Sequence, residues 1–149
     1  MIDKNITFQV LSDYEKINEI MIFCANSFYN QSINSVEKIS ELAKKFSDSA
    51  MFVIAKINND VAGFTAFYCN DIKTKIAYLS MIIIVERYKG KGIGRLLLNN
   101  CIDLCNKYEM SKLRLEVNVN NNTAIKFYLK NGFTHIGNKD KSYYFEKNI

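Results

Sequence analysis

The sequence predicts an α+β fold in which helices flank a mixed, mostly antiparallel central sheet. The apolar run 79–85 is typical of a strand buried on both faces, and a glycine-rich turn and a helical pattern follow it. The apolar runs 50–57 and 61–68 flank the turn-forming residues 58–60, which indicates a hairpin. Helical and strand periodicities alternate along the rest of the chain, and no proline interrupts them.

The N-terminal third is predicted to combine a strand with two helices. Residues 5–11 have strand character, and Ser12 or Asp13 offers an N-cap for an amphipathic helix that extends to about Ser27. A polar connection leads to a second helix, which Ser35 caps. The apolar face of this second helix is formed by Val36, Ile39, Leu42, Ala43 and Phe46.

The second half of the chain is predicted to hold two helices between further strands. The helix 93–108 follows the glycine-rich turn, whereas Asn121 or Asn122 caps a shorter helix that Asn131-Gly132 ends with a left-handed cap. The predicted strands after the hairpin are 76–85, 112–119, 133–137 and 143–147. The residues that the helix 93–108 offers to the core are Leu96, Leu97, Ile102 and Leu104. The resulting order is β-α-α-β-β-β-α-β-α-β-β.

The segment 89–94, Lys-Gly-Lys-Gly-Ile-Gly, has the composition of an anion-binding turn. The first N–H groups of a helix have no partner inside it, and the helix dipole adds positive potential at the same point. Glycines at alternate positions let a bulky anion approach the backbone, and Lys89, Lys91 and Arg95 add positive charge. The segment therefore predicts a phosphate or pyrophosphate site. The alternative is an ordinary strand-to-helix turn.

The spacing of these glycines separates the segment from two common phosphate-binding motifs. It lacks the GxxxxGK[ST] pattern of a Walker loop, and GxGxG differs from the GxGxxG of a dinucleotide-binding turn. It resembles the [Arg/Gln]-x-x-Gly-x-[Gly/Ala] signature of the GNAT N-acetyltransferases, here Lys89-x-x-Gly92-x-Gly94. Lys89 replaces Arg or Gln, and Glu86 stands where many members have proline. Neither departure removes a backbone donor.

A second motif extends the resemblance over essentially the whole chain. Residues 115–117 (LEV), the NxxAxxxY pattern from Asn121 to Tyr128 and the Gly132-Phe133 pair reproduce a GNAT spacing about 25 residues after the first motif. The resemblance implies a single GNAT domain over residues 1–149. It also implies that acetyl-CoA is the co-substrate, with its pantetheine in a gap beside the central strand. The implied cofactor-binding residues are Ile82, Ile83, Ile84, Lys89, Gly90, Lys91, Gly92, Ile93, Gly94, Arg95, Asn121 and Ala124.

The resemblance further implies direct transfer of acetyl from acetyl-CoA to a primary amine. Glu116 is the candidate base, because its spacing is similar to that in ribosomal-protein-alanine acetyltransferases; the alternative is a solvated glutamate paired with Arg114 or a lysine. Tyr128 is the candidate acid, since a phenol with a pKa near 10 can protonate a thiolate whose conjugate acid has a pKa near 8.5. The alternative for Tyr128 is a core aromatic. A backbone N–H near Ile84 is expected to polarise the acetyl carbonyl.

The amine acceptor is expected to be a small molecule or a peptide. Its pocket should form between the two N-terminal helices, their connection and the C-terminal hairpin. Candidate wall residues are Phe28, Tyr29, Tyr143 and Tyr144. A non-catalytic acyl-CoA-binding or regulatory module of the same fold is the alternative function. A nucleotide-binding protein is disfavoured, because the glycine spacing does not fit and no acidic ribose partner follows.

Composition argues against several other classes of protein. The net charge of +5 is spread over scattered lysines, which does not predict a nucleic-acid interface. No apolar run approaches the roughly 20 residues that cross a bilayer, and the N-terminus lacks signal-peptide features, so a cytoplasmic location is expected. A homodimer is compatible with the sequence. His135 is the only histidine and no CxxC pair occurs, so we expect no metal site and reduced cysteines that act as small hydrophobic residues.

Overall fold

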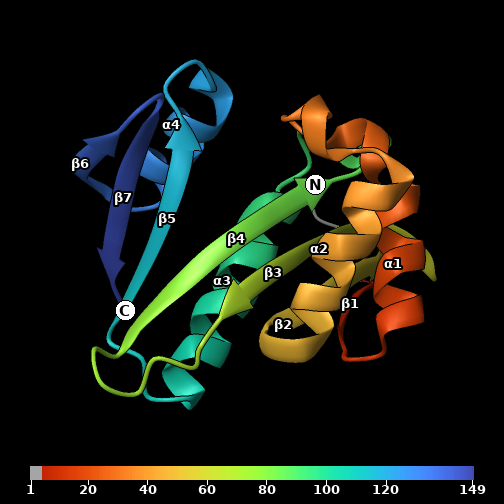
Figure 1. Cartoon of the computed structure of the whole chain (residues 1–149), viewed down its shortest axis with the longest axis horizontal. Helices are drawn as coiled ribbons and strands as arrows, with labels where there is room; N and C mark the ends of the chain where they lie inside the picture. Colours follow the sequence, from red (N-terminus) through yellow and green to blue (C-terminus); the bar gives the residue numbers. More distant parts are fainter. Residues whose placement is uncertain (1–4) are drawn as a thin grey trace.

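The computed structural model describes residues 5–149, which form one sheet with helices on both faces (Figure 1). The strands are β1 (Ile6–Leu11), β2 (Met51–Ile57), β3 (Asp60–Tyr68), β4 (Ile76–Ile84), β5 (Lys112–Asn118), β6 (Thr134–Lys139) and β7 (Ser142–Asn148). The α-helices are α1 (Tyr14–Phe23), α2 (Val36–Ser49), α3 (Ile93–Lys107) and α4 (Asn122–Lys130). Short 3-10 helices are η1 (Ala25–Ser27), η2 (Gln31–Ile33) and η3 (Glu86–Tyr88).

The strands are arranged in the order β1-β2-β3-β4-β5-β7-β6. Neighbouring strands are antiparallel except for β4 and β5, which are parallel. The long connection between these two strands carries α3, as a parallel pair requires. The α+β class, the mostly antiparallel sheet and the predicted order of elements are therefore confirmed.

The N-terminal helices have the predicted caps but one different boundary. The Asp13 carboxylate accepts the Lys16 N–H at 3.0 Å, and the Ser35 hydroxyl accepts a backbone N–H at 3.2 Å. The first helix ends at Phe23 rather than near residue 27, and the chain continues through η1 and η2. Phe28 between them is only 3% exposed. Its burial draws the connection back toward the sheet, which a continued helix would not allow.

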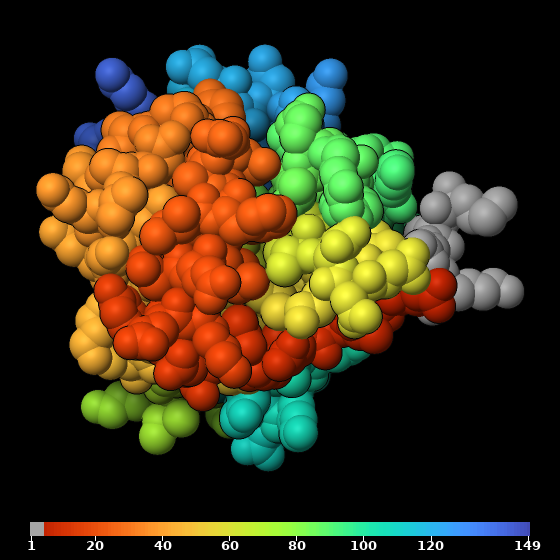
Figure 2. Space-filling view, turned by 90° about the vertical axis from the view of Figure 1, so that its right-hand side faces the viewer, coloured from red at the N-terminus to blue at the C-terminus, as the bar shows by residue number. Residues whose placement is uncertain are grey.

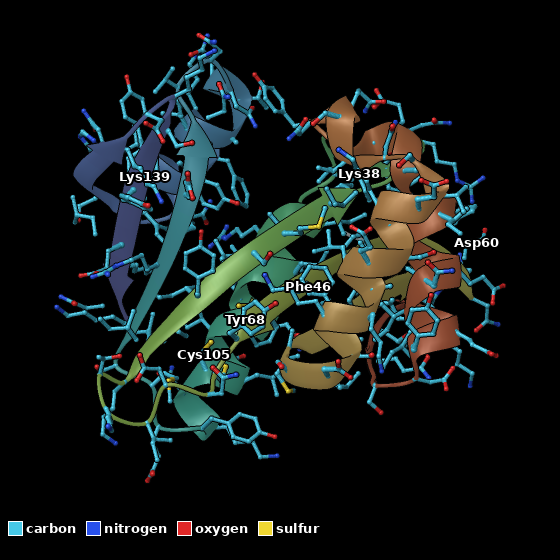
Figure 3. The ribbon with its side chains drawn as sticks, viewed as in Figure 1. Lys38, Phe46, Asp60, Tyr68, Cys105 and Lys139 are labelled. Atoms are coloured by element: carbon cyan, nitrogen blue, oxygen red, sulfur yellow. The ribbon has the colours of Figure 1, made fainter. Side chains whose placement is uncertain are left out.

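The helices cover the sheet in two layers. On one face, α1 and α2 pack on β2, β3 and the second half of β4, and Figure 3 shows Phe46 of α2 beside Tyr68 of β3, with 6.4 Å between ring centroids. On the other face, α3 and α4 pack on β3, β4, β5 and β7. Val36 of the predicted apolar face of α2 is exposed, because it lies in the first turn beyond the sheet contact.

The core face of α3 differs from the prediction by one position. Leu97 is buried as expected, but Leu96, Ile102 and Leu104 are only partly buried. Their places in the core are taken by residues shifted around the helix: Ile93, Leu98, Cys101 and Cys105. The four cysteines are free thiols, and the sulfur of Cys105 (Figure 3) lies 3.3 Å from that of Cys69 at the end of β3.

Strand β4 contains one additional residue, Ser80. Opposite it on β3, Phe67 pairs with Leu79 and the preceding residue pairs with Met81, so Ser80 has no counterpart. Such a bulge shifts the alternation of side chains by one residue. Leu79 packs toward α3, Met81 packs toward α1 and α2, and Ser80 itself is exposed. The prediction of a strand buried on both faces is therefore confirmed in part: Ile83 is buried under α1 and α2, whereas Ile82 and Ile84 on the other face are only partly buried.

The parallel pair β4–β5 is hydrogen-bonded along only part of its length. The register runs from Ile76 opposite Lys112 to Leu79 opposite Leu115, where it ends at the bulge. Beyond this point the two strands diverge, as Figure 1 shows. The second half of β4 therefore has a neighbouring strand on only one side, β3.

Candidate active site

A cleft of about 1810 Å³ occupies the divergence between β4 and β5. Its lining comes from the second half of β4, the loop before α3, the end of β5, α4 and the segment that contains η1 and η2. Figure 2 shows the η1–η2 segment (orange) and the loop before α3 (green) at the same end of the molecule. Pockets for one small ligand usually measure about 300–1,000 Å³. The cleft is therefore large enough for a bulky cofactor together with a second substrate.

The loop before α3 presents the anion-binding geometry that its sequence predicts. Gly90 and Gly92 have φ angles of +76° and +83°, in the left-handed region that favours glycine. Gly92 is the N-cap of α3, and its carbonyl accepts the N–H of Leu96 at 3.3 Å. The N–H groups of Ile93 and the residues after it in the first turn have no acceptor inside the helix. They are available to an anion in the cleft.

Charged side chains surround this loop, although one of them lies apart from the cleft. Lys89 pairs with Glu86 at 2.9 Å, but both side chains are well exposed, and such pairs contribute about 0–1 kcal/mol. An anionic ligand can therefore compete for Lys89. Arg95 lines the cleft, whereas Lys91 does not and lies 5.8 Å from the ring of Tyr88. Lys91 is thus the one predicted cofactor residue that the structure leaves out of the lining.

The β4 wall of the cleft is held close to β3. A side chain at Gly63 of β3 would place its Cβ 2.2 Å from the carbonyl oxygen of Ile83, so only glycine fits there. Ile82, Ile83 and Ile84 all line the cleft as predicted. Their side chains diverge, because that of Ile83 belongs to the core under α1 and α2 while the other two lie on the α3 side. The edge of this strand that faces away from β3 borders the cleft.

The start of α4 forms the opposite wall. Asn121 is the N-cap of α4, and its side-chain oxygen accepts the N–H of Ala124 at 3.2 Å. Both residues line the cleft, as predicted. Because the side-chain oxygen is engaged in the cap, the NH₂ group of Asn121 is the part that can act as a donor. A Cβ at Gly94 would lie 3.4 Å from the Phe127 ring, so α3 and α4 approach closely here.

Tyr128 of α4 both lines the cleft and packs in the core. It is 7% exposed, and the rings of Phe127 and Phe133 lie 5.3 and 5.4 Å from its own ring centroid. The pKa of the Tyr128 phenol is raised above its ordinary value of 10.0, mainly by burial and to a smaller extent by the nearby Cys101 thiol. The phenol is therefore protonated at neutral pH. It can donate a proton, although less readily than an ordinary phenol.

Glu116 of β5 is exposed and lines the cleft. Arg114, which the sequence offered as a partner, instead binds Glu146 of β7, with Nε and Nη2 lying 2.9 and 2.5 Å from one carboxylate oxygen. None of the ion pairs among residues 5–149 involves Glu116. Its carboxylate is therefore free of a cationic partner within the described chain, which leaves it accessible to a ligand.

Tyr78 of β4 is a cleft residue that the sequence analysis missed. The pKa of Tyr78 is raised to about 12, first by burial and then by the negative charge of Glu116 and by Tyr144. The phenol therefore lies close to the Glu116 carboxylate. One signal was available, because Tyr78 is the only hydroxyl-bearing residue of the strand before Ser80. Its contact with Glu116 depends on the register of β4 and β5, which the sequence does not reveal.

The residues expected to form the acceptor wall divide between the cleft lining and its surroundings. Phe28 and Tyr29 line the cleft, together with neighbouring residues of the η1–η2 segment. Tyr143 and Tyr144 lie outside the lining, and Ser142 is the residue of β7 that reaches it. Tyr144 pairs with Glu116 in the sheet and lies beside the cleft rather than in it.

The chain belongs to the acetyltransferase (GNAT) family, whose model matches residues 14–133. This confirms the resemblance drawn from the two motifs. Among curated relatives, the spermine/spermidine N(1)-acetyltransferase of Bacillus subtilis is 33% identical over 87 residues, which are 54% of this chain and 57% of that protein. The putative [ribosomal protein bS18]-alanine N-acetyltransferase of the same organism is 28% identical over 95 residues, 64% of this chain and 60% of that protein. The chain spans about half the length of the curated relatives it matches.

Solved structures share the fold over nearly the whole chain. The PaiA N-acetyltransferase of Thermoplasma acidophilum, in complex with coenzyme A, has a TM-score of 0.76 at 20% identity over 96% of this chain and 99% of that chain. An acetyltransferase of Thermus thermophilus has a TM-score of 0.80 at 15% identity and full coverage of both chains. At these identities the likeness establishes the fold alone.

Within residues 5–149, no group of three or more histidine, cysteine, aspartate or glutamate side chains is arranged to hold a metal ion. No helix in the described part of the chain combines the length and the apolar character needed to cross a membrane.

Proposed function

We propose that this chain, as a single GNAT domain over residues 1–149, is an N-acetyltransferase that uses acetyl-CoA and a primary amine. The observation that carries the proposal is one continuous cleft. It joins the glycine-lined start of α3, the unpaired edge of β4 and the side chains of Glu116 and Tyr128. Membership of the acetyltransferase (GNAT) family supports this function.

The residues divide the proposed work between binding and proton transfer. The N–H groups at the start of α3 bind the pyrophosphate of acetyl-CoA, and the free edge of β4 binds its pantetheine. A backbone N–H near Ile84 polarises the thioester carbonyl. Glu116 accepts a proton from the amine whose nitrogen attacks that carbonyl carbon, and Tyr128 donates a proton to the sulfur as the C–S bond breaks. The products are the acetylated amine and the free thiol of CoA.

The test is release of CoA thiol from acetyl-CoA in the presence of a panel of amines, peptides and aminoglycosides. Calorimetric binding of acetyl-CoA, CoA and ATP is measured alongside. We expect acetyl-CoA to bind and at least one acceptor class to release thiol. Binding of acetyl-CoA without release from any acceptor would favour the alternative, a non-catalytic acyl-CoA-binding or regulatory module. Preference for ATP would contradict both.

Tyr128→Phe tests the proposed acid directly. We expect kcat to fall about 100-fold while the Kd of acetyl-CoA stays unchanged, because the ring and its packing remain and only the proton donor is lost. Since burial raises the pKa of Tyr128, its deprotonation should not reduce kcat at any pH below 10. The matched control is Tyr108→Phe, at an exposed tyrosine after α3 and outside the cleft. A Tyr128→Phe enzyme with normal kcat would show that another group supplies the proton.

A further inference from the structure

We define the acceptor end of the cleft by side chains from three separate elements, of which Tyr78 and Glu116 lie close together. Tyr29 comes from the η1–η2 segment, Tyr78 from β4 and Glu116 from β5, and all three line the cleft. Tyr29 is 55% exposed, so its ring is accessible to a ligand. This acceptor end therefore offers an aromatic surface, a phenolic hydrogen-bonding group and one carboxylate.

The η1–η2 segment beside it is held in place by its own hydrogen bonds. The Gln31 side chain donates to the Phe28 carbonyl at 2.5 Å and accepts from the Asn34 side chain at 2.5 Å. Asn30 accepts both the N–H and the hydroxyl of Ser32, at 3.0 and 2.6 Å. The wall is thus neutral and polar, and it is shaped without an acceptor present. Such a wall suits a chain of peptide groups, which offers donors and acceptors but no charge.

The cleft lining contains more basic residues than acidic ones. Among the described residues, Glu116 is the only acidic one in the lining, whereas the basic residues are Lys89, Arg95 and Lys130. Lys89 lies in the loop before α3 and Arg95 in the first turn of α3, where the cofactor phosphates are proposed to bind. Even when the cofactor neutralises these two, the remaining charges of the lining are one carboxylate and one ammonium group. A single ammonium group can be matched by Glu116, but a second or third on the same acceptor cannot.

We propose that the acceptor end of the cleft takes the α-amino group of a peptide-like acceptor with a single positive charge and discriminates against polyamines. This inference rests on the proposed acetyltransferase function. Glu116 and Tyr78 bind the amine, and the neutral η1–η2 wall contacts the chain that follows it.

The acidity of the amine favours the same acceptor. An α-amine has a pKa near 8, so its neutral form costs about 1 kcal/mol at pH 7, whereas a lysine-like amine with a pKa near 10.4 costs about 4.6 kcal/mol. The site contains one carboxylate as a base, and the only histidine, His135, lies on β6 outside the lining. An amine that loses its proton easily therefore needs the least from this site.

The first experiment compares acceptors that differ in charge. With the full chain and saturating acetyl-CoA at pH 8, kcat/KM is measured for tetra-alanine amide, for the amide of Ala-Lys-Ala-Ala, and for spermidine. N-acetylated tetra-alanine amide is the blank. We expect tetra-alanine amide to be at least tenfold better than spermidine, and the lysine peptide to lie between them. Equal or better use of spermidine would overturn the inference and leave the acetyltransferase function standing. Acetyl-CoA binding without thiol release from any of the three or from the wider amine panel would overturn both.

A gain-of-function variant tests the charge argument separately. Asn118 lies two residues after Glu116 on the same face of β5, and its side-chain oxygen accepts the N–H of Asn120 at 2.8 Å, which aspartate can also do. Asn118→Asp therefore adds a second carboxylate while keeping the local structure. We expect the spermidine-to-peptide ratio of kcat/KM to rise about fivefold. The control Asn99→Asp, on the exposed side of α3, should leave the ratio unchanged. An unaltered ratio in Asn118→Asp would contradict charge matching as the basis of selection.

Discussion

The two ends of the cleft are built in different ways. The end proposed to bind the cofactor phosphates comes from one continuous stretch, residues 86–95, and its main functional groups belong to the backbone. The end proposed to bind the acceptor is assembled from the η1–η2 segment, β4 and β5, and its functional groups are side chains. A backbone site can therefore be recognised in a sequence by the residues that permit its conformation. A site made of side chains depends on strand register and on the course of loops.

Gly92→Glu should have the largest effect and is confined to the cofactor end. A side chain at φ +83° is strained by about 1–2 kcal/mol, and the new carboxylate would occupy the place of the pyrophosphate. We expect the Kd of acetyl-CoA, measured by calorimetry, to rise at least 100-fold. The charge contribution is isolated by Gly92→Ala, which carries the strain alone and should change Kd by no more than about 10-fold. Unchanged affinity in Gly92→Glu would show that the phosphates bind elsewhere.

Gly63→Ala should have an intermediate effect, because Gly63 supports the wall that both ends share. The Cβ would meet the Ile83 carbonyl oxygen at 2.2 Å, so β3 and β4 must move apart. We expect the free energy of unfolding, measured in denaturant, to fall by about 2–3 kcal/mol, and acetyl-CoA to bind more weakly. Gly137→Ala on β6 is the control, since a Cβ there meets nothing within 4 Å. Equal losses of stability in the two variants would mean that the close approach of β3 and β4 is not needed.

Glu146→Gln should have the smallest effect and leave both ends of the cleft intact. Burial alone would raise the pKa of Glu146, but Arg114 and then Lys112 hold it below its ordinary value of 4.5. A lowered pKa in the folded protein stabilises it above the unfolded value, and this contribution is lost as pH falls below about 4.5. We expect the variant to be less stable by about 1 kcal/mol at pH 7, with the difference from the native protein shrinking below pH 4.

Two further measurements complete the Glu146→Gln experiment. The Kd of acetyl-CoA should not change, because Glu146 joins β5 to β7 outside the cleft lining. Asp48→Asn, which breaks the exposed pair with Lys44, should cost less than about 0.5 kcal/mol. A difference in stability that persists at pH 3 would show that Glu146 contributes through packing rather than through its charge.

The sequence predicted the order of elements well because each has a local signal. Asp13 and Ser35 cap their helices, and Asn58-Asn59 forms the turn between β2 and β3 with positive φ at both residues. The early end of α1 was not predictable from helical periodicity, because it follows from the burial of Phe28 against Phe64, 36 residues away, with 6.3 Å between ring centroids.

The residues of the candidate site were likewise predictable only where a local motif marks them. The glycine loop and the Asn121 cap lie where local motifs placed them, with Lys91 outside the lining. Tyr78 was missed because its contact with Glu116 crosses two strands whose register no local motif reveals. The identity of the partner of Arg114 was missed for the same reason, since Glu146 lies 32 residues further along the chain.

Ser80 shifts the alternation of side chains along β4 by one residue. Up to Leu79 the odd-numbered residues face α3, whereas from Met81 onward the even-numbered residues do. The first half of β4 is thus hydrogen-bonded to a strand on each side, β3 and β5, whereas the second half is hydrogen-bonded only to β3. Deleting Ser80 would make β4 a regular strand and leave Met81 facing α1 and α2, with Ile82 and Ile84 still on the α3 side. The opening between β4 and β5 thus begins at the point where this single additional residue interrupts the regular pairing of β4.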